Sequence, residues 1–279
     1  MLHAQPLTTL EHPLLLPYRT MKAQRDHHQQ RIFVAEGEKI VQRLLDTPFT
    51  LISAVMPPKW LEILRPRLEA RPELVEVFVA EKEDLERLTG FSMYQGVFAV
   101  AHIPNPTPLP EALDRSPRPW FLVAVDGINN SENLGALVRS CAAFGVHALL
   151  QGETSSSPYM RRAVRSSMGN IFWLPVVECF CLAHSLRYLK SRGVRLVAAH
   201  PHTDQRTLPQ AQLAGDCCLV FGSEGSGLSP AVLDVCDEWV AIPMAPQVDS
   251  LNVGAAAAVF CYETARQRGA MGRNPQPLP

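Results

Sequence analysis

Residues 219–229 read LVFGSEGSGLS, so a short apolar segment runs directly into a glycine-rich loop. Glycine has no Cβ, and a loop built from it lets the backbone come close to a ligand. The loop carries one carboxylate, Glu224, and it ends at Ser229 and Pro230, which are typical of a helix N-cap and the first helical position. This stretch predicts a buried strand, a binding loop and a helix start in an α/β fold.

A second apolar segment leads into a second loop, and residues 241–254 read AIPMAPQVDSLNVG. Pro243 and Pro246 restrict the backbone of this loop. Ser250 and Asn252 stand where a helix would begin, beside backbone N–H groups that have no partner within the helix. Residues 254–258 (GAAAA) follow, and they are small enough for another helix or backbone to lie against them.

The glycine cluster admits a dinucleotide-binding interpretation, with an NAD-type oxidoreductase as the function. A dinucleotide fingerprint has the order G-x-G-x-x-G at the first strand-to-helix turn of its unit. Residues 222–227 instead have the order G-x-x-G-x-G and come late in the chain. A tight turn with a purely structural role is the other alternative that the loop alone leaves open.

A third segment lies upstream, where the apolar residues 121–126 are followed by NNSENLGALVRSCAAFGV at 129–146. Together the three segments resemble, in order and in residue type, the three motifs of the SpoU (TrmH) family of RNA ribose 2′-O-methyltransferases within the SPOUT superfamily. Three motifs in order are far more specific than any one of them. The matching positions are Asn133, Gly135 and Arg139 for the first motif, 222–228 for the second, and 242–244 with 250–253 for the third.

The resemblance implies an S-adenosyl-L-methionine-dependent transfer of a methyl group to a ribose 2′-hydroxyl of tRNA or rRNA. Residues at the matching family positions are then expected to act in catalysis (Arg139, Asn133, Glu224, Ser250 and Asn252) or to contact the cofactor (Gly222, Ile242, Leu251, Phe221, Pro243 and Met244). Arg139 is expected beside the target ribose, either as a transiently deprotonated base or as a group that orients the hydroxyl and the phosphate. Because guanidinium is effectively always protonated, both roles stay open.

Two positions depart from the family pattern: Ser131 stands where many members have proline, and Gly254 where serine is common. Neither is among the residues expected to act in the chemistry. A catalytically silent relative that binds RNA as a structural or assembly factor is the alternative function. The presence of the five expected catalytic residues argues against it.

Composition bounds the class of protein. A chain of 279 residues that is 47% hydrophobic and 19% charged suggests about two globular domains. No apolar run reaches the length of a membrane span, and the N-terminus lacks the pattern of a signal peptide, so we expect a cytoplasmic protein without membrane contact. The formal net charge is −1. RNA attraction therefore requires a local basic segment, and Arg161, Arg162 and Arg165 are the candidates, although a solvated helix face would look the same.

Seven cysteines, an odd number, lie mostly within apolar patterns, which favours reduced thiols in the core over disulfides. Neither 179–181 (CFC) nor the adjacent pair at 217–218 has the spacing of a zinc site. We therefore predict no metal. His200 and His202, which follow a strand candidate, are expected to be exposed loop residues.

Four regions are predicted along the chain. Residues 1–103 alternate strand and helix patterns, with strands at 31–35, 51–55, 75–79 and 96–101 and helices at 37–46, 60–68 and 84–88. They resemble the small, ribosomal-protein-like α/β substrate-binding domain of many SpoU proteins. Residues 104–119 contain six prolines and predict an extended linker, 120–268 the methyltransferase domain, and 269–279 a disordered tail.

Within 120–268, strand candidates lie at 120–126, 146–151, 171–176, 194–199, 217–222 and 238–242, which predicts a parallel sheet with helices on both faces. The resemblance implies more than this pattern does: a trefoil knot, and a cofactor pocket formed by the loops after the last three strands. It also implies a homodimer, and the helix from Ala255 to Phe260 is small and apolar enough for such packing. The same composition would suit burial within one subunit.

Overall fold

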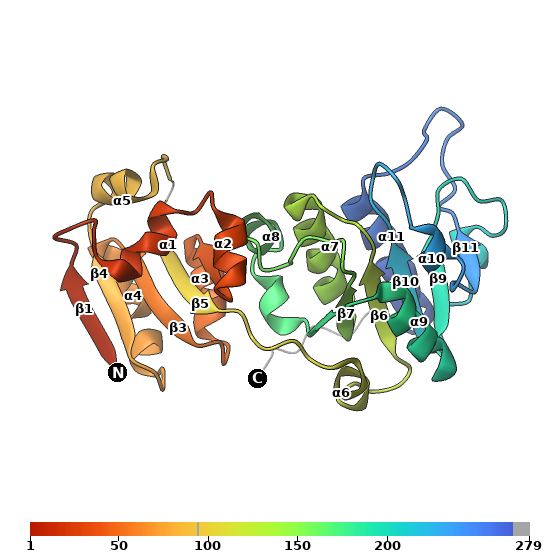
Figure 1. Ribbon diagram of the computed structural model, residues 1–279, viewed down its shortest axis with the longest axis horizontal. Coiled ribbons are helices and arrows are strands. Elements are labelled where there is room, and N and C mark those ends of the chain that lie inside the picture. The colour runs from red at the N-terminus through yellow and green to blue at the C-terminus, as the bar shows by residue number, and fades with distance from the viewer. Residues whose placement is uncertain (94, 270–279) are drawn as a thin grey trace. The chain divides into compact units, whose positions relative to one another are not determined.

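The computed structural model describes residues 1–93 and 95–269, and the chain divides into two compact units (Figure 1). Unit 1 contains Met1–Asn105 together with Ser157–Trp173. Unit 2 contains Pro106–Ser156 and the chain from Leu174 onward. The predicted tail falls outside the described residues, apart from Gly269.

Unit 1 is built on a five-stranded sheet in the order β1-β4-β3-β5-β2. Strands β1, β4 and β3 run parallel, whereas β5 is antiparallel to both β3 and β2, so the sheet is mixed. The sequence pattern did not predict β1. The strands of this sheet are β1 (Leu2–Pro6), β2 (Ile32–Glu36), β3 (Leu51–Met56), β4 (Val75–Val79) and β5 (Phe98–His102).

Helices of unit 1 come from two parts of the chain. The apolar positions of α3, which are Ile40, Val41, Leu44 and Leu45, are all buried, as a single apolar face requires. The helices are α1 (Leu16–Arg19), α2 (Gln24–Gln29), α3 (Glu38–Leu45), α4 (Pro58–Glu69), α5 (Lys82–Thr89) and α8 (Arg161–Ser166), with short 3-10 helices at Pro13–Leu15 and Asn170–Trp173.

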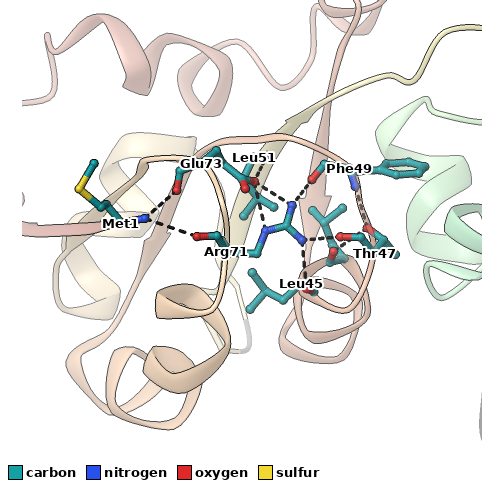
Figure 2. Close-up of polar contacts among 8 residues, drawn as sticks. Met1, Leu45, Thr47, Phe49, Leu51, Arg71 and Glu73 are labelled. Atoms are coloured by element: carbon teal, nitrogen blue, oxygen red, sulfur yellow. Dashed lines mark hydrogen bonds and ion pairs between the residues drawn. The ribbon is translucent and has the colours of Figure 1, made fainter. Parts of the chain in front are cut away.

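A buried arginine ties together the loops at one end of this sheet (Figure 2). Arg71 donates to the backbone oxygens of Leu45, at 3.1 Å, and of Thr47 and Phe49, and it donates to Glu73 Oε1 at 2.7 Å. Glu73 Oε1 also accepts from the backbone N–H of Leu51. The guanidinium is thus paired and hydrogen-bonded, which a buried charge requires.

The segment Ser157–Trp173 belongs to unit 1, although we predicted it within the methyltransferase domain. The ring of Phe172 lies 5.5 Å from that of Phe33 and 5.7 Å from that of Phe49. Arg43 donates to the backbone oxygen of Met168 at 2.5 Å. The predicted strand at 171–176 was therefore misplaced: Ile171 and Phe172 are buried in a 3-10 helix of unit 1, and the strand lies at Val176–Glu178 of unit 2.

Unit 2 is built on a six-stranded sheet in the order β11-β9-β10-β6-β7-β8, and every neighbouring pair is parallel. The predicted parallel α/β sheet is confirmed. Its strands are β6 (Phe121–Val125), β7 (Ala148–Gln151), β8 (Val176–Glu178), β9 (Arg195–Ala199), β10 (Cys217–Phe221) and β11 (Glu238–Val240).

Helices cover both faces of this sheet. Side chains of α6 and α9 share one core with Leu122 and Ala124 of β6, while Phe260 of α11 packs edge-on against Phe221 of β10. The helices are α6 (Leu109–Asp114), α7 (Ser131–Ala143), α9 (Leu182–Ser191), α10 (Pro230–Leu233) and α11 (Val253–Gln267), with a 3-10 helix at Leu208–Gln210.

Helix α6 lies inside the predicted extended linker, so that prediction was wrong in part. Pro108 is the N-cap of α6 and Pro110 is in its first turn, where a missing N–H costs nothing. Leu109, Ala112 and Leu113 are buried in the core of unit 2. Apolar residues between the prolines therefore outweigh the extended preference of the prolines themselves.

Helices α7 and α11 approach each other closely at Gly254. A Cβ at Gly254 would lie 2.8 Å from the Cβ of Ala136, closer than side chains normally come. The departure from the family pattern at Gly254 thus has a local cause, since Ala136 occupies the space that a serine would need. The expectation that another helix lies against residues 254–258 holds within one chain.

All seven cysteines are free thiols, as predicted, and five of them are buried. Burial raises the pKa of Cys217 to about 11 and that of Cys236 to about 12, so both thiols are protonated near neutral pH. In the described part of the chain, no three His, Cys, Asp or Glu side chains gather as metal ligands would. None of the helices described there is long and apolar enough to cross a bilayer.

Candidate functional site

A cavity of about 440 Å³ opens at the carboxyl ends of β9, β10 and β11. Ligands of open parallel sheets bind at this edge, because successive loops converge there. We call it the strand-end cavity. Residues of four segments line it: 199–202 after β9, 221–228 after β10, Val240, Ile242 and Met244 around the end of β11, and Ser250–Val253 with Ala256 and Phe260 at the start of α11.

The glycine-rich loop forms one wall of this cavity and folds back on itself. Ser223 and Gly227 exchange two backbone hydrogen bonds of 3.0 Å each. A Cβ at Gly222 would lie 2.3 Å from the carbonyl carbon of Gly227, so only glycine fits there. At Gly227 the backbone has φ +67°, a left-handed conformation that favours glycine. Gly222 and Gly227 thus serve the turn itself, which then presents Glu224 at its tip.

The three sequence motifs meet at one side-chain amide. Asn252 Nδ2 donates to Asn133 Oδ1 at 2.9 Å and to Glu224 Oε1 at 2.7 Å. Asn252 Oδ1 accepts from the backbone N–H groups of Gly254 and Ala255, and so caps α11. All four hydrogen-bonding functions of this amide are oriented, and they fix Asn133 and Glu224 relative to the helix start.

Arg139 lies apart from this network. It is on α7, beyond Asn133, its side chain is exposed, and it lines neither the strand-end cavity nor the second cavity described below. Asn252 and Glu224 are hydrogen-bonded to each other, and Asn252 also donates to Asn133. Arg139 is therefore available to a group that approaches from solvent.

Most of the residues expected to contact a cofactor line the strand-end cavity. Phe221, Gly222, Ile242, Met244 and Leu251 do so, as does Ser250 from the set of expected catalytic residues. Pro243 is exposed and is absent from the lining. Its neighbours Ile242 and Met244 both line the cavity, with Pro243 between them outside it.

The sequence analysis expected His200 and His202 to be exposed loop residues and did not assign them to a ligand site. His202 is exposed, as predicted, whereas His200 is half-buried. His200 and His202 line the strand-end cavity, and the ring of His200 stacks on Trp239 with 5.2 Å between centroids and 15° between planes. The backbone N–H of His200 donates to Val240. The signal was available, since both residues directly follow a strand of a parallel sheet, at the edge where ligands bind.

A second cavity, of about 580 Å³, lies across the glycine-rich loop from the first. Asn129, Asn130 and Asn133 contribute its side-chain amides, so we call it the amide-lined cavity. The buried carboxylate of Asp126 also lines it and accepts from the backbone N–H of Ser229 at 2.7 Å. Residues 223–228 and Val253 line both cavities.

The arginines proposed for RNA contacts differ in their surroundings. Arg161, only 14% exposed, forms an ion pair with Glu36 within unit 1, and Arg165, 64% exposed, pairs with the same carboxylate at 3.0 Å. Arg162 is exposed. Arg161 is thus engaged within the fold, whereas Arg162 and much of Arg165 face solvent.

The fold of unit 2 and the cavity at the carboxyl ends of β9, β10 and β11 define a class: an α/β protein with a parallel sheet whose strand-end loops enclose a ligand cavity. Comparison with known proteins then gives the family. The sequence pattern of the SpoU rRNA methylase family matches residues 121–262, and this chain belongs to that family. Membership excludes the NAD-type oxidoreductase alternative, because the glycine-rich loop is the second motif of a methylase.

Relatives extend the likeness over most of the chain. An uncharacterized tRNA/rRNA methyltransferase of Mycobacterium bovis is 34% identical over 84% of this chain and 81% of its own length. The 23S rRNA (guanosine-2′-O-)-methyltransferase RlmB of Pectobacterium atrosepticum is 33% identical over 72% of this chain and 82% of its own.

Solved structures agree with the family. The SpoU methyltransferase AviRb of Streptomyces viridochromogenes matches with a TM-score of 0.78 and 25% identity over 92% of this chain and 97% of its own. An RNA 2′-O ribose methyltransferase matches with a TM-score of 0.71 and 26% identity over 96% and 99%. AviRb has also been crystallised with S-adenosylmethionine.

Proposed function

We propose that this protein transfers the methyl group of S-adenosyl-L-methionine to a ribose 2′-hydroxyl of tRNA or rRNA. The observation that carries the proposal is the amide of Asn252, which joins one residue from each of the three family motifs at the rim of the strand-end cavity. These hydrogen bonds fix the side chains of Asn133 and Glu224, and a reaction that depends on alignment requires its polar groups to be held in place.

The strand-end cavity suits this cofactor. Its volume of about 440 Å³ falls in the range of small-molecule sites, and its lining combines apolar residues such as Phe221, Ile242 and Met244 with glycines and polar residues. We assign the contacts with the cofactor to the backbone of Gly222, Ile242 and Leu251 and to the side chains of Phe221 and Met244. The bound cofactor supplies an electrophilic methyl group on a sulfonium.

The reaction forms a bond between the ribose oxygen and the methyl carbon, breaks the carbon–sulfur bond, and releases the hydroxyl proton. We assign to Arg139 the orientation of the hydroxyl and the neutralisation of the neighbouring phosphate, because guanidinium does not give up its proton in water. Its exposure leaves it accessible to RNA. The proton passes to water at the open mouth of the site, where Glu224 is also exposed.

We also propose a homodimer in which α11 contacts a second copy. Val259 and Tyr262 on α11 are 38% and 44% exposed, and large apolar side chains on one helix face favour an interface. Light scattering should give twice the mass of the chain, and Val259→Glu should give the mass of one. An unchanged dimer in that variant would contradict this interface.

A trefoil knot is the finer fold that the family implies for unit 2. It is supported by the backbone pairing of Thr207 and Leu208, in the loop after β9, with Ala241 just beyond β11. Mechanical unfolding of unit 2 from its two ends should yield a contour length shorter than that of a free chain, because a tightened knot retains residues. A full contour length would remove this proposal.

RNA binding is assigned to unit 1 and to the exposed arginines of α8. Arg162 faces solvent and is free to contact a phosphate, unlike Arg161. Each phosphate contact adds about one to the slope of log affinity against log salt concentration. Arg162→Ala should reduce that slope by about one, and an unchanged slope would remove Arg162 from the interface.

The direct test is methyl transfer from labelled S-adenosylmethionine to total tRNA and to rRNA that lack this enzyme's modification, followed by nucleoside analysis. A labelled 2′-O-methylnucleoside is the expected product. Label on a base would contradict the assigned reaction. Cofactor binding without transfer to any cellular RNA would favour the silent RNA-binding relative.

A further inference from the structure

The amide-lined cavity adjoins the proposed reaction centre, and none of the proposed cofactor contacts requires it. Glu224 lines both cavities, and Asn133 of the amide-lined cavity is hydrogen-bonded to Asn252 of the strand-end cavity. A molecule in the amide-lined cavity would therefore lie directly across the glycine-rich loop from the cofactor.

Unused hydrogen-bonding groups line this cavity. Asn130 Oδ1 accepts from backbone N–H groups in the first turn of α7, and Asn133 Oδ1 accepts from the side-chain amide of Asn252. Their Nδ2 donors, and the whole side-chain amide of Asn129, form no hydrogen bond with the residues that the structure describes. Three amides with free donors thus meet at one cavity.

The charge of the lining discriminates between ligands. Neither lysine nor arginine occurs among the residues that line the cavity, and Asp126 and Glu224 add two carboxylates. A phosphate would meet negative charge without a cation, which is unfavourable. A neutral heterocycle with donors and acceptors on its edge suits amide side chains, which offer both.

The remaining lining provides apolar contact. Ile128, Leu228, Pro230 and Val253 are part of the wall, so one side of a flat ring could lie against apolar atoms while its edge meets the amides. The amide-lined cavity, at about 580 Å³, is larger than the strand-end cavity, at about 440 Å³, to which we assign a complete cofactor. It is therefore large enough for a nucleobase.

We infer that the amide-lined cavity receives the nucleobase of the target nucleotide, splayed out of the RNA, and that Asn129 hydrogen-bonds its edge. This inference rests on the proposed function and adds the substrate subsite to it. Enzymes that modify one nucleotide of a folded RNA read unstacked bases by edge hydrogen bonds and ring contact. With the base held there, its ribose reaches the Asn133–Asn252–Glu224 network.

The test fills the cavity without touching the cofactor wall. Asn129→Trp places an indole in the amide-lined cavity, and Asn129 is not among the residues of the strand-end cavity. Gln212→Trp is the matched control, because Gln212 is an exposed neutral residue of unit 2 that lines neither cavity. We expect both variants to bind S-adenosylhomocysteine with unchanged Kd by calorimetry.

Methyl transfer should fall at least tenfold in Asn129→Trp and stay within twofold in Gln212→Trp. The decisive substrate is the mapped target RNA with an abasic ribose at the methylated position, which needs no base pocket. Wild type and Asn129→Trp should methylate it equally well. Full activity of Asn129→Trp on normal RNA, or an equal loss on abasic RNA, would overturn the inference.

A second variant tests the subsite in case Asn129→Trp does not fold. If Asn129→Trp loses S-adenosylhomocysteine binding, Asn129→Ala removes one hydrogen bond, worth about 1 kcal/mol, and should raise KM for RNA about fivefold with kcat nearly unchanged. An unchanged KM would count against the subsite. Failure of the wild-type protein to methylate any RNA would instead refute the proposed function, so the two failures are distinguishable.

Discussion

Replacing Gly222 by alanine should disable the site through one methyl group. The added Cβ would lie 2.3 Å from the carbonyl carbon of Gly227 and 2.4 Å from the backbone nitrogen of Leu228. These are backbone atoms, which cannot rotate away as a side chain could. The loop must open, and the two hydrogen bonds between Ser223 and Gly227 are then lost.

The size of the effect follows from these contacts. Overpacking in a well-packed region costs about 1–3 kcal/mol, and two net backbone hydrogen bonds cost about 1–3 kcal/mol together. The lower total, about 2 kcal/mol, corresponds to a roughly 30-fold loss of affinity for a ligand that needs the closed loop. The melting temperature should fall by about 4–8 °C.

The assay is calorimetric binding of S-adenosylhomocysteine, with two further variants of the same loop. A Cβ at Gly225 meets nothing within 4 Å, so Gly225→Ala should bind almost as the wild type does. Gly227→Ala has space but places alanine at φ +67°, which costs about 1–2 kcal/mol. Wild-type affinity in Gly222→Ala, or an equal loss in Gly225→Ala, would refute the steric argument.

Three further outcomes are expected. Arg139→Ala should abolish methyl transfer and leave the Kd of S-adenosylhomocysteine nearly unchanged, because Arg139 does not line the strand-end cavity; a large change in Kd would contradict its role. Asn252→Asp keeps the helix cap but places a carboxylate beside Glu224 in place of the donated hydrogen bond, so transfer should fall about 10–100-fold with little change in melting temperature; normal transfer would show that the network is dispensable. Burial disfavours the charged form of Glu73, but the Arg71 hydrogen bond and the backbone donors outweigh it and lower the pKa below 4.5. The stability that the Glu73 carboxylate contributes is therefore present above pH 4.5 and is lost as pH falls through the lower pKa of the folded state. The difference in the free energy of urea unfolding between wild type and Glu73→Gln should therefore shrink in acid. A difference that stays constant with pH would show that the pKa of Glu73 is the same in the folded and unfolded states.

Much of unit 2 could be predicted from the sequence, because its strands β6 and β10 are continuous apolar runs that end at Asp126 and Gly222. The runs at 121–125 and 217–221 have every residue buried, which is the pattern of a central parallel strand. Helix α6 was missed because proline density was read as an extended linker, whereas the buried residues between the prolines decided the outcome.

The segment at 157–173 shows what periodicity cannot reveal. An apolar pattern predicts burial for residues such as Ile171 and Phe172, but it does not say in which core they are buried. Phe172 lies in the core of unit 1 through Phe33 and Phe49, residues more than 120 positions earlier in the chain. Such a pairing is set by tertiary packing rather than by local propensity.

Some site residues could be predicted from the sequence motifs, whereas others depend on where the fold places them. The motif positions Asn133, Glu224 and Asn252 were chosen by resemblance, and the structure joins them through one amide. His200 was expected to be an exposed loop residue, because two histidines in a loop have no spacing that identifies a ligand site. Only the position of that loop at the end of β9 places His200 at the cavity.

The return of residues 157–173 to unit 1 affects how the protein is made. Translation delivers β1–β5 long before the segment that completes their unit, and about 70 residues separate Asn105 from Trp173. At roughly 5–20 residues per second, the ribosome needs several seconds to supply them. During that interval the rings of Phe33 and Phe49 lack Phe172, which leaves an apolar surface for chaperones to cover.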